Sequence, residues 1–141
     1  MPKTEEITSR PTVRILFVCV ENAGRSQMAE GFAKALAPNG VEIFSAGSKP
    51  AAALNPIVVQ AMQERGIDIR LQVPKGFAAL PPIQFDVVVG MGCEDACPAT
   101  LAKRVIEWKI PDPKEQPIET VRIIRDQLEN QVERLLLDLL G

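Results

Sequence analysis

The stretch formed by residues 13–30 constrains the fold of this chain more than any other part. Residues 13–20 are almost continuously apolar and rich in Val, Ile and Phe, which is typical of a parallel strand buried on both faces. A short loop follows, and residues 26–37 carry good helix formers with apolar side chains at helical spacing. A buried strand that leads through a tight loop into a helix predicts an α/β domain.

The rest of the chain continues this alternation of strands and helices. Strands are predicted at residues 41–44, 85–89 and 105–109, and helices at 55–65, 76–80 and 118–140. Residues 93–103 are predicted to form a loop followed by a short helix. The order predicts one α/β domain over residues 12–141, built on a four-stranded parallel sheet flanked by helices. Residues 1–11 are polar, and we expect them to form a flexible N-terminal extension.

Composition excludes several classes of function. A net charge of −2, with 16 basic and 18 acidic residues and no basic cluster, argues against nucleic-acid binding. No apolar run approaches the roughly 18 residues of a membrane span, and residues 1–11 lack the apolar core of a secretory signal. We expect a cytoplasmic protein, and a monomer. The absence of histidine excludes Cys-His and Ser-His catalysis and the commonest zinc ligand.

The loop after the first strand has the features of an oxyanion-binding site. A loop between a strand and a helix N-terminus offers unpaired backbone amides and the positive end of the helix dipole. Gly24 permits the turn that points successive amides inward. The planar Arg25 guanidinium suits two oxygens of phosphate or arsenate. The predicted oxyanion-binding residues are Val20, Glu21, Asn22, Ala23, Gly24 and Arg25.

The same loop makes Cys19 a candidate nucleophile. Its positive surroundings favour the thiolate form of the cysteine, and the Ser26 hydroxyl could donate a hydrogen bond to that thiolate. The alternative is that Cys19 is a small buried residue at a strand end and that Arg25 is a surface residue. Glu21 is unhelpful in an anion site unless its carboxylate points outward.

Cys19, Cys93 and Asp112 each come just after a predicted strand. Sites in parallel sheets lie at the carboxyl ends of strands, so one edge of the sheet could gather all three residues. Asp112 lies between two prolines, where it is either a plain turn residue or a proton donor near the anion. Chemistry alone leaves three other carboxylates open as the acid: Glu21, Glu94 and Asp95.

Cys93 and Cys97 are separated by three residues. They could be small core residues, and three cysteines without histidine do not readily form a closed zinc site, so no metal site is predicted. In a reducing cytosol, cysteines that accompany a nucleophile are more often redox-active. A disulfide needs Cβ atoms about 3.5–4.5 Å apart, closer than the about 5–6 Å between residues four apart on a helix. A disulfide between Cys93 and Cys97 would therefore require residues 90–103 to change shape on oxidation and not to form one rigid helix.

Several motifs, taken in order, resemble one group of enzymes. Cys19-x5-Arg25-Ser26 at the start of a small α/β domain is similar to the low-molecular-weight tyrosine phosphatase superfamily. Further segments resemble its arsenate reductase branch: residues 25–31, 45–47, 55–56, 61–62, 66–69, 91–93, 97–98, 108 and 112–113. The resemblance runs from about residue 13 to the C-terminus.

This resemblance implies a flavodoxin-like topology and a reaction that uses three cysteines. Cys19 would attack arsenate, Cys93 would attack Cys19 to release arsenite, and Cys97 would attack Cys93. The Cys93–Cys97 disulfide would then be reduced by thioredoxin, glutaredoxin or mycoredoxin, with no tightly bound cofactor. Phosphate or sulfate would bind as analogues of arsenate. The acid of the family matches Asp112.

The resemblance also bears on potassium. In potassium-binding members of the family, Asn22, Glu30 and Ser45 match residues around the ion. A further position that is acidic in those members is occupied by Lys75 in this chain. Because an ammonium group could replace the bound cation, we predict weak or absent dependence on potassium.

Three functions remain in competition. The leading interpretation is a thiol-dependent arsenate reductase that serves arsenic detoxification. The alternative is a phosphotyrosine phosphatase with a Cys19 phospho-enzyme, which needs only Cys19, Arg25 and Asp112. Such phosphatases often carry tyrosines after the Asp-Pro pair, whereas this chain has no tyrosine, although weak activity on small esters is plausible. A non-catalytic oxyanion or arsenic sensor is the third, and the absence of a DNA-binding face counts against it.

Overall fold

A four-stranded parallel sheet is the framework of the molecule. The structure is a computed structural model and describes residues 12–92 and 102–141. The strands are β1 (Val13–Cys19), β2 (Val41–Gly47), β3 (Val87–Gly90) and β4 (Val105–Glu107). They lie in the order β2-β1-β3-β4, and every neighbouring pair is parallel. The predicted sheet is confirmed, and the strand order is that of a flavodoxin-like fold.

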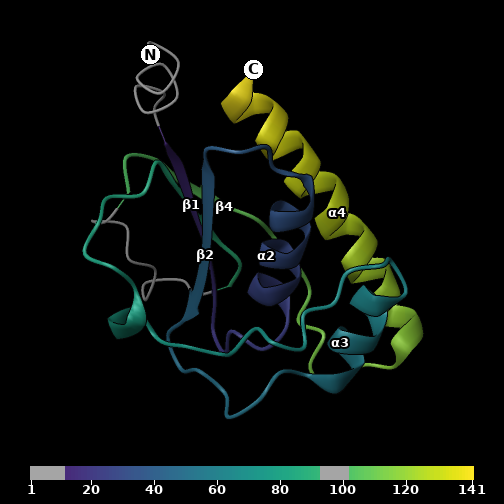
Figure 1. Ribbon diagram of the computed structural model, residues 1–141. Coiled ribbons are helices and arrows are strands. Elements are labelled where there is room, and N and C mark those ends of the chain that lie inside the picture. The colour runs from purple at the N-terminus through teal and green to yellow at the C-terminus, as the bar shows by residue number, and fades with distance from the viewer. Residues whose placement is uncertain (1–11, 93–101) are drawn as a thin grey trace.

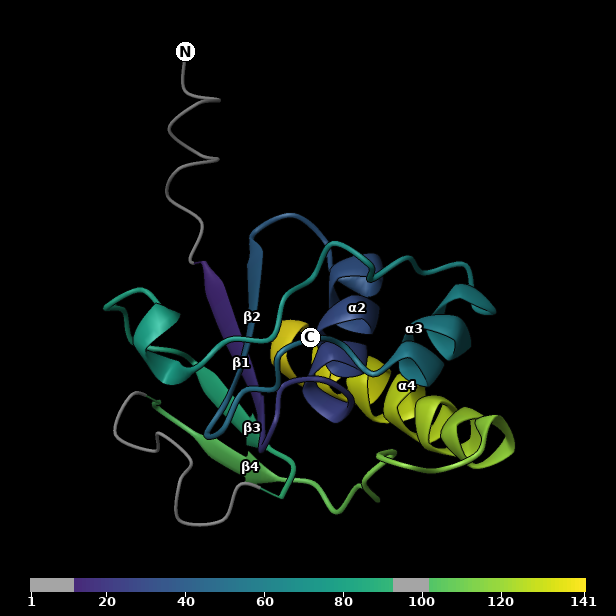
Figure 2. The ribbon, with the colours of Figure 1, turned by 90° about the horizontal axis from the view of Figure 1, so that it is seen from below.

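Helices cover one face of this sheet (Figures 1 and 2). In the described part of the chain they are α2 (Arg25–Leu36), α3 (Pro56–Gln63) and α4 (Ile118–Leu140). α4 packs against both α2 and α3. Its buried face carries an apolar stripe: Val121, Ile124, Leu128, Val132, Leu135 and Leu136. The 3-10 helix η1 (Phe77–Ala79) lies on the opposite face of the sheet (Figure 1).

β1 is the centre of the core because both of its faces are covered. Ile15 and Phe17 pack into the cluster formed with the helices. Leu16 and Val18 pack into the smaller cluster on the opposite face, which η1 helps to cover. All four side chains are fully buried. This two-sided burial accounts for the nearly continuous apolar run of residues 13–20.

β2 is longer than the sequence predicted. The predicted strand ended at residue 44, but pairing with β1 continues to Gly47, which lies opposite Cys19. A Cβ atom on Gly47 would lie 2.5 Å from the carbonyl oxygen of Val20, so glycine alone permits this approach. The bounds of the other predicted elements differ from the observed ones by at most two residues.

Two predictions concern segments outside the described residues. They are the flexible extension at residues 1–11 and most of the loop and short helix at residues 93–103. Cys93 and Cys97 belong to the second segment, as do Glu94 and Asp95. These predictions therefore stay predictions.

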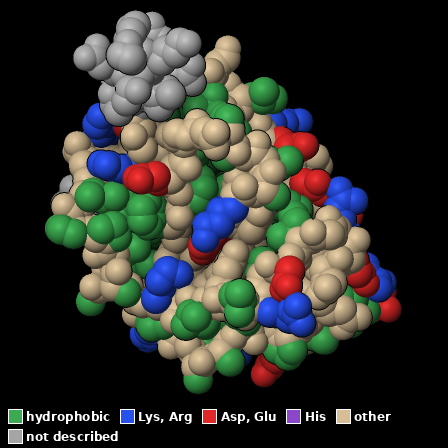
Figure 3. Space-filling view, viewed as in Figure 1, with side chains coloured by type: hydrophobic (Ala, Val, Ile, Leu, Met, Phe, Trp, Pro, Cys, Tyr) green, Lys and Arg blue, Asp and Glu red, His purple; other side chains and the backbone are tan. Residues whose placement is uncertain are grey.

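The surface that Figure 3 shows mixes charges of both signs. Acidic and basic side chains are interspersed with apolar ones on this face (Figure 3). Among residues 12–92 and 102–141, no helix has the length and hydropathy needed to cross a membrane.

Candidate active site

The site begins where β1 ends and α2 starts. Cys19 is the last residue of β1 and is only 2% exposed. Its Sγ atom lies 2.9 Å from the Ser26 hydroxyl oxygen, in the first turn of α2. The Asn22 side-chain amide donates to that same hydroxyl at 2.7 Å, which leaves the single Ser26 hydrogen free to point at the sulfur. The predicted contact between Ser26 and a Cys19 thiolate therefore has the geometry it needs.

The loop between β1 and α2 has all of its carbonyl groups tied to other groups. The carbonyl oxygens of residues 19, 20, 21 and 23 accept backbone hydrogen bonds from Ser48, Lys49, Ala51 and Asn55, at 2.8–3.3 Å. The Asn22 carbonyl accepts from the Gln27 side chain at 3.0 Å, and the Gly24 carbonyl from the Met28 amide at 2.9 Å. The segment of residues 48–55 thus fixes the outer side of the loop.

The amides of the same loop remain available. Within the described part of the chain, the backbone N–H groups of Glu21, Asn22, Ala23 and Gly24 donate to no protein acceptor. The helix cap at Gly24 has no side-chain hydrogen bond either, so the first turn of α2 also presents free amides. A loop with satisfied carbonyls and unsatisfied amides attracts an anion and repels a cation.

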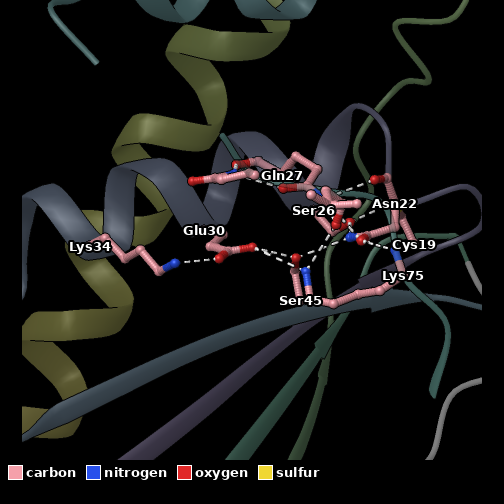
Figure 4. Close-up of polar contacts among 10 residues, drawn as sticks. Cys19, Asn22, Ser26, Gln27, Glu30, Lys34, Ser45 and Lys75 are labelled. Carbon is pink, nitrogen blue, oxygen red and sulfur yellow. Dashed lines mark hydrogen bonds and ion pairs between the residues drawn. The ribbon is translucent and has the colours of Figure 1, made fainter. Parts of the chain in front are cut away.

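Asn22 holds this loop in shape. Its φ angle of +52° lies in the left-handed region, which a non-glycine residue adopts only when its surroundings compensate. The side-chain amide of Asn22 donates to Ser26 and to Ser45, at 2.7 and 3.0 Å. Its side-chain oxygen accepts from the Gln27 side chain and the Lys75 backbone, at 2.9 and 3.0 Å (Figure 4). Four hydrogen-bond partners from three parts of the chain therefore hold Asn22 in its left-handed conformation.

The network continues from Ser45 to a buried carboxylate. The Ser45 hydroxyl donates to Glu30, a side chain only 6% exposed. Lys34 lies 2.6 Å from the other carboxylate oxygen of Glu30, and the Lys75 ammonium lies 4.0 Å from the first (Figure 4). Two lysines thus compensate the one buried carboxylate beneath the loop.

Arg25 is held in place from two sides. Its Nη1 donates to the carbonyl oxygen of Ile110 at 3.3 Å, and its side chain is 11% exposed. Gly92 lies directly against the guanidinium, because a Cβ atom there would come within 2.8 Å of Nη1. Gly92 also has a φ angle of +90°, a backbone conformation that favours glycine at this position.

Asp112 lies at the outer edge of the site. Its Oδ2 is 3.6 Å from Nη2 of Arg25, and its side chain is 57% exposed. Pro113 is buried and packs on the loop, since a Cβ atom on Gly24 would be 2.8 Å from the proline ring. Asp112 is therefore brought beside the predicted anion site, as its place after a predicted strand suggested.

Cys19, Arg25 and Asp112 line a cavity of about 310 Å³. Its described lining comprises Cys19, Glu21, Ala23, Gly24, Arg25, Ala51, Ala53, Leu54, Asn55, Pro56, Asp112, Pro113, Lys114 and Glu115. The Glu21 carboxylate, which the sequence required to point outward, bonds to the Lys114 ammonium at 2.9 Å. In residues 12–92 and 102–141, no group of three or more His, Cys, Asp or Glu side chains could hold a metal ion.

Sequence reasoning missed the residues that support the loop from outside. Gln27 is fully buried and bonds to both the backbone and the side chain of Asn22. Asn55 caps α3, since its side-chain oxygen accepts from the Ile57 amide at 2.9 Å. Its own backbone amide also fixes the Ala23 carbonyl at 3.0 Å. No local signal in the sequence reveals this support, because the partners that bury Gln27 lie about 45 positions away.

Comparison with known proteins places this site in a family. The family model described as "Low molecular weight phosphotyrosine protein phosphatase" matches residues 14–140. The chain belongs to this family. Because residues 14–140 include the loop, Arg25 and the Asp112-Pro113 pair, the match covers the whole described site.

The similar proteins carry one recurring activity in their names. A protein of Synechocystis named glutaredoxin arsenate reductase is 34% identical over 126 residues, which cover 87% of this chain and 95% of that protein. A solved arsenate reductase in a phosphate-binding state is 32% identical with a TM-score of 0.81, covering 90% of this chain and 98% of that one. The thioredoxin-dependent arsenate reductase of Corynebacterium glutamicum is 32% identical with a TM-score of 0.75, covering 97% of this chain and 66% of that one.

Proposed function

We propose that this chain reduces arsenate to arsenite in the reducing cytosol, as part of arsenic detoxification, with Cys19 as the nucleophile. The observation that carries the proposal is the loop in which the carbonyls of residues 19–24 are bonded and the amides of residues 21–24 are free. Such a loop binds a tetrahedral oxyanion against the Cys19 sulfur. The names of the similar proteins support arsenate as that oxyanion.

In the first step the Cys19 thiolate attacks arsenic, and one arsenate oxygen leaves as water after it takes up protons. The loop amides and the Arg25 guanidinium hold the other oxygens. Asp112 gives a proton to the leaving oxygen, since it is the carboxyl group that lines the cavity beside Arg25. The product is a sulfur–arsenic bond in which arsenic is still arsenic(V).

Reduction occurs when a second thiolate attacks the Cys19 sulfur. The electron pair of the sulfur–arsenic bond passes to arsenic, which leaves as arsenite, and a disulfide forms. We assign this attack to Cys93 and the following attack on Cys93 to Cys97. Cys93 comes directly after Gly92 in the chain, and Gly92 contacts the Arg25 guanidinium. A thioredoxin, glutaredoxin or mycoredoxin dithiol then reduces the Cys93–Cys97 disulfide and completes the balance.

The supporting network bears on the role of potassium. The Lys75 ammonium stands 4.0 Å from the Glu30 carboxylate, within the network that shapes Asn22. A protein cation at this position supplies the positive charge that a bound potassium ion would otherwise bring. We therefore propose a reaction that does not depend on potassium. We also propose that the chain is a monomer and uses no tightly bound cofactor.

A phosphatase is the second candidate because Cys19, Arg25 and Asp112 suffice for a phospho-enzyme. The described wall of the cavity contains no aromatic side chain to stack on a phosphotyrosine ring. Small apolar residues such as Ala51, Ala53 and Leu54 line it instead. Weak hydrolysis of small phosphate esters is the form of this activity that the cavity supports.

The test couples arsenate reduction to a thioredoxin system and follows NADPH consumption. We expect wild-type protein to consume NADPH, and the Cys19→Ser, Cys93→Ser and Cys97→Ser variants each to lose this activity. Loss in Cys19→Ser alone would point to a phosphatase or to a reductase served by a small thiol, and would remove the two downstream cysteines from the reaction. Replacing thioredoxin by glutaredoxin in the same assay identifies the reductant.

A further inference from the structure

An ion pair crosses the outer edge of the cavity. The Lys114 ammonium and the Glu21 carboxylate lie 2.9 Å apart, although 93 positions separate them in the sequence. Their side chains are 57% and 39% exposed, whereas Cys19 is 2% exposed. Both residues line the cavity. The sulfur is therefore at the floor of the cavity and the ion pair is at its rim.

The backbones of both partners are fixed, so the pair joins two positioned walls. The Glu21 carbonyl accepts from the Ala51 amide at 2.9 Å, which anchors this part of the loop. On the other side, the Lys114 amide donates to Asp112 at 3.0 Å, and the preceding Pro113 packs on Gly24. Neither partner needs to order a flexible segment in order to meet the other.

The charges of the two partners reinforce the contact. The hydrogen bond from Lys114 to the Glu21 carboxylate raises the pKa of Lys114 above its ordinary value, and the nearby charges of Glu115 and Asp112 act in the same direction. Lys114 therefore keeps its charge throughout the pH range in which the protein would work. The pair also neutralises the carboxylate that the loop carries beside its anion site.

We propose that the Glu21–Lys114 ion pair closes the rim of the cavity and selects small oxyanions over phosphoryl groups that carry a bulky ester. This inference rests on the proposed function for the identity of the natural oxyanion, but not for the selection itself. A bare tetrahedral anion reaches Cys19 beneath the pair. An aryl ester must hold its ring between the two walls, so the ion pair has to separate. The expected discrimination is about three- to fivefold, the scale of one exposed ion pair.

The test compares the dissociation constants of methylphosphonate and phenylphosphonate by isothermal titration calorimetry. Both ligands resist hydrolysis and share a headgroup, so the ratio of their dissociation constants isolates the ring. The variants are Glu21→Gln, Lys114→Met and the double variant. Lys49→Met is the matched control, since Lys49 is exposed and its amide bonds to the Val20 carbonyl at 2.8 Å without its side chain lining the cavity.

The two single variants change the local charge in opposite directions. Glu21→Gln strengthens and Lys114→Met weakens the binding of both anions, yet each should improve phenylphosphonate relative to methylphosphonate by about three- to fivefold. The double variant should give the same ratio as either single variant, and Lys49→Met the wild-type ratio. High salt should shift the wild-type ratio in the same direction as the variants, because it screens an exposed pair.

If Glu21→Gln leaves the ratio of the two dissociation constants unchanged, the proposed closure by the ion pair is wrong. If only Lys114→Met changes the ratio, the lysine acts through its bulk and not through the ion pair. These outcomes leave the proposed function intact as long as methylphosphonate binds. No binding of methylphosphonate to wild-type protein would overturn both the oxyanion site and its closure. Arsenate reduction with an unchanged ratio would overturn only the closure.

Discussion

Two polar clusters of this protein contain similar types of residue but differ in burial and in the part of the structure that they support. The loop-support network consists of Asn22, Ser26, Gln27, Glu30 and Ser45, all of which are buried. The helix ion-pair cluster consists of Glu64, Arg65, Arg122, Arg125 and Glu129, and it joins α3 and the residues just after it to α4. Most of its side chains are between one-fifth and one-half exposed.

The two clusters differ in the free energy needed to bury their polar side chains and in the part of the structure that they hold in place. Burying five polar side chains is unfavourable unless each is hydrogen-bonded, and in the described part of the chain no buried side-chain N or O atom lacks a partner. The loop-support network therefore fixes one arrangement of the loop. Apart from Arg125, the members of the helix ion-pair cluster are partly exposed, so each of their ion pairs contributes little to stability. We infer that the first cluster serves the site and that the second serves the fold.

Asn22→Ala is expected to have the largest effect. It removes one hydrogen-bond partner from each of Ser26, Ser45, Gln27 and the Lys75 amide, so we expect the free energy of unfolding to fall by about 3 kcal/mol. Cysteine reactivity and arsenate reduction should fall at least about 100-fold, since a loop displaced by about 1 Å loses the anion geometry. Urea denaturation and steady-state kinetics measure the two effects.

Asn22→Gly is the matched control for this change. Glycine relieves the left-handed backbone and should recover about 1 kcal/mol relative to alanine. It restores none of the hydrogen bonds, so activity should stay low. Full activity in either variant would show that the network is not needed to shape the loop.

Arg125→Met tests the second cluster and should have an intermediate effect. Arg125 donates to the Ala61 carbonyl at 3.0 Å and to Glu64 at 2.9 Å, and its loss leaves that carbonyl unpaired. We expect the free energy of unfolding to fall by about 1–2 kcal/mol, with kcat and KM for arsenate unchanged. A drop in kcat comparable to that of Asn22→Ala would end the distinction between the two clusters.

Glu64→Gln sharpens the comparison through pH. Hydrogen bonds from Arg122 and Arg125 lower the pKa of Glu64 from 4.5 to about 2. The carboxylate therefore contributes stability that is fully present above about pH 4.5 and is lost as the pH falls through about 2. The variant should be less stable than wild type at neutral pH, and the two should converge towards pH 2 in urea titrations. A constant gap across this range would remove Glu64 from the acid sensitivity of the fold.

The smallest expected effect is that of potassium. Because Lys75 already provides a cation beside Glu30 at 4.0 Å, replacing sodium by potassium at constant ionic strength should leave the rate of arsenate reduction unchanged. A Lys75→Met variant measured in the same two salts serves as the comparison. A clear rise in wild-type activity with potassium would contradict the proposed role of Lys75.

The sequence predicted the parts of this site that are local. The strand, the loop and the helix at residues 13–36 follow one another, so their hydrophobic pattern and the spacing of Cys19, Arg25 and Ser26 carry the information. The four-stranded sheet followed from the alternation of elements, and the location of Asp112 near Cys19 followed from its place after a strand. The choice of Asp112 as the acid rested on the family resemblance.

The remaining features depend on pairings across the chain, which local patterns do not encode. The amides of residues 48–55 that fix the loop carbonyls became neighbours only because β2 continues to Gly47 beside Cys19. The Lys114 partner of Glu21 lies 93 positions away, so the carboxylate looked misplaced in an anion loop. Gln27 reads as an ordinary helix residue until the Val73 carbonyl and the Gln72 side chain are found beside it.

The central claim is that the loop holds an oxyanion against Cys19 so that thiols can reduce it. A single-turnover reaction tests it directly: fully reduced protein is mixed with excess arsenate without any external reductant, and arsenite and free thiols are counted. We expect one arsenite per protein, the loss of two thiols, and a Cys93–Cys97 disulfide in the peptide map. Arsenite formation without loss of protein thiols, or no arsenite from protein that still binds phosphate, would contradict it.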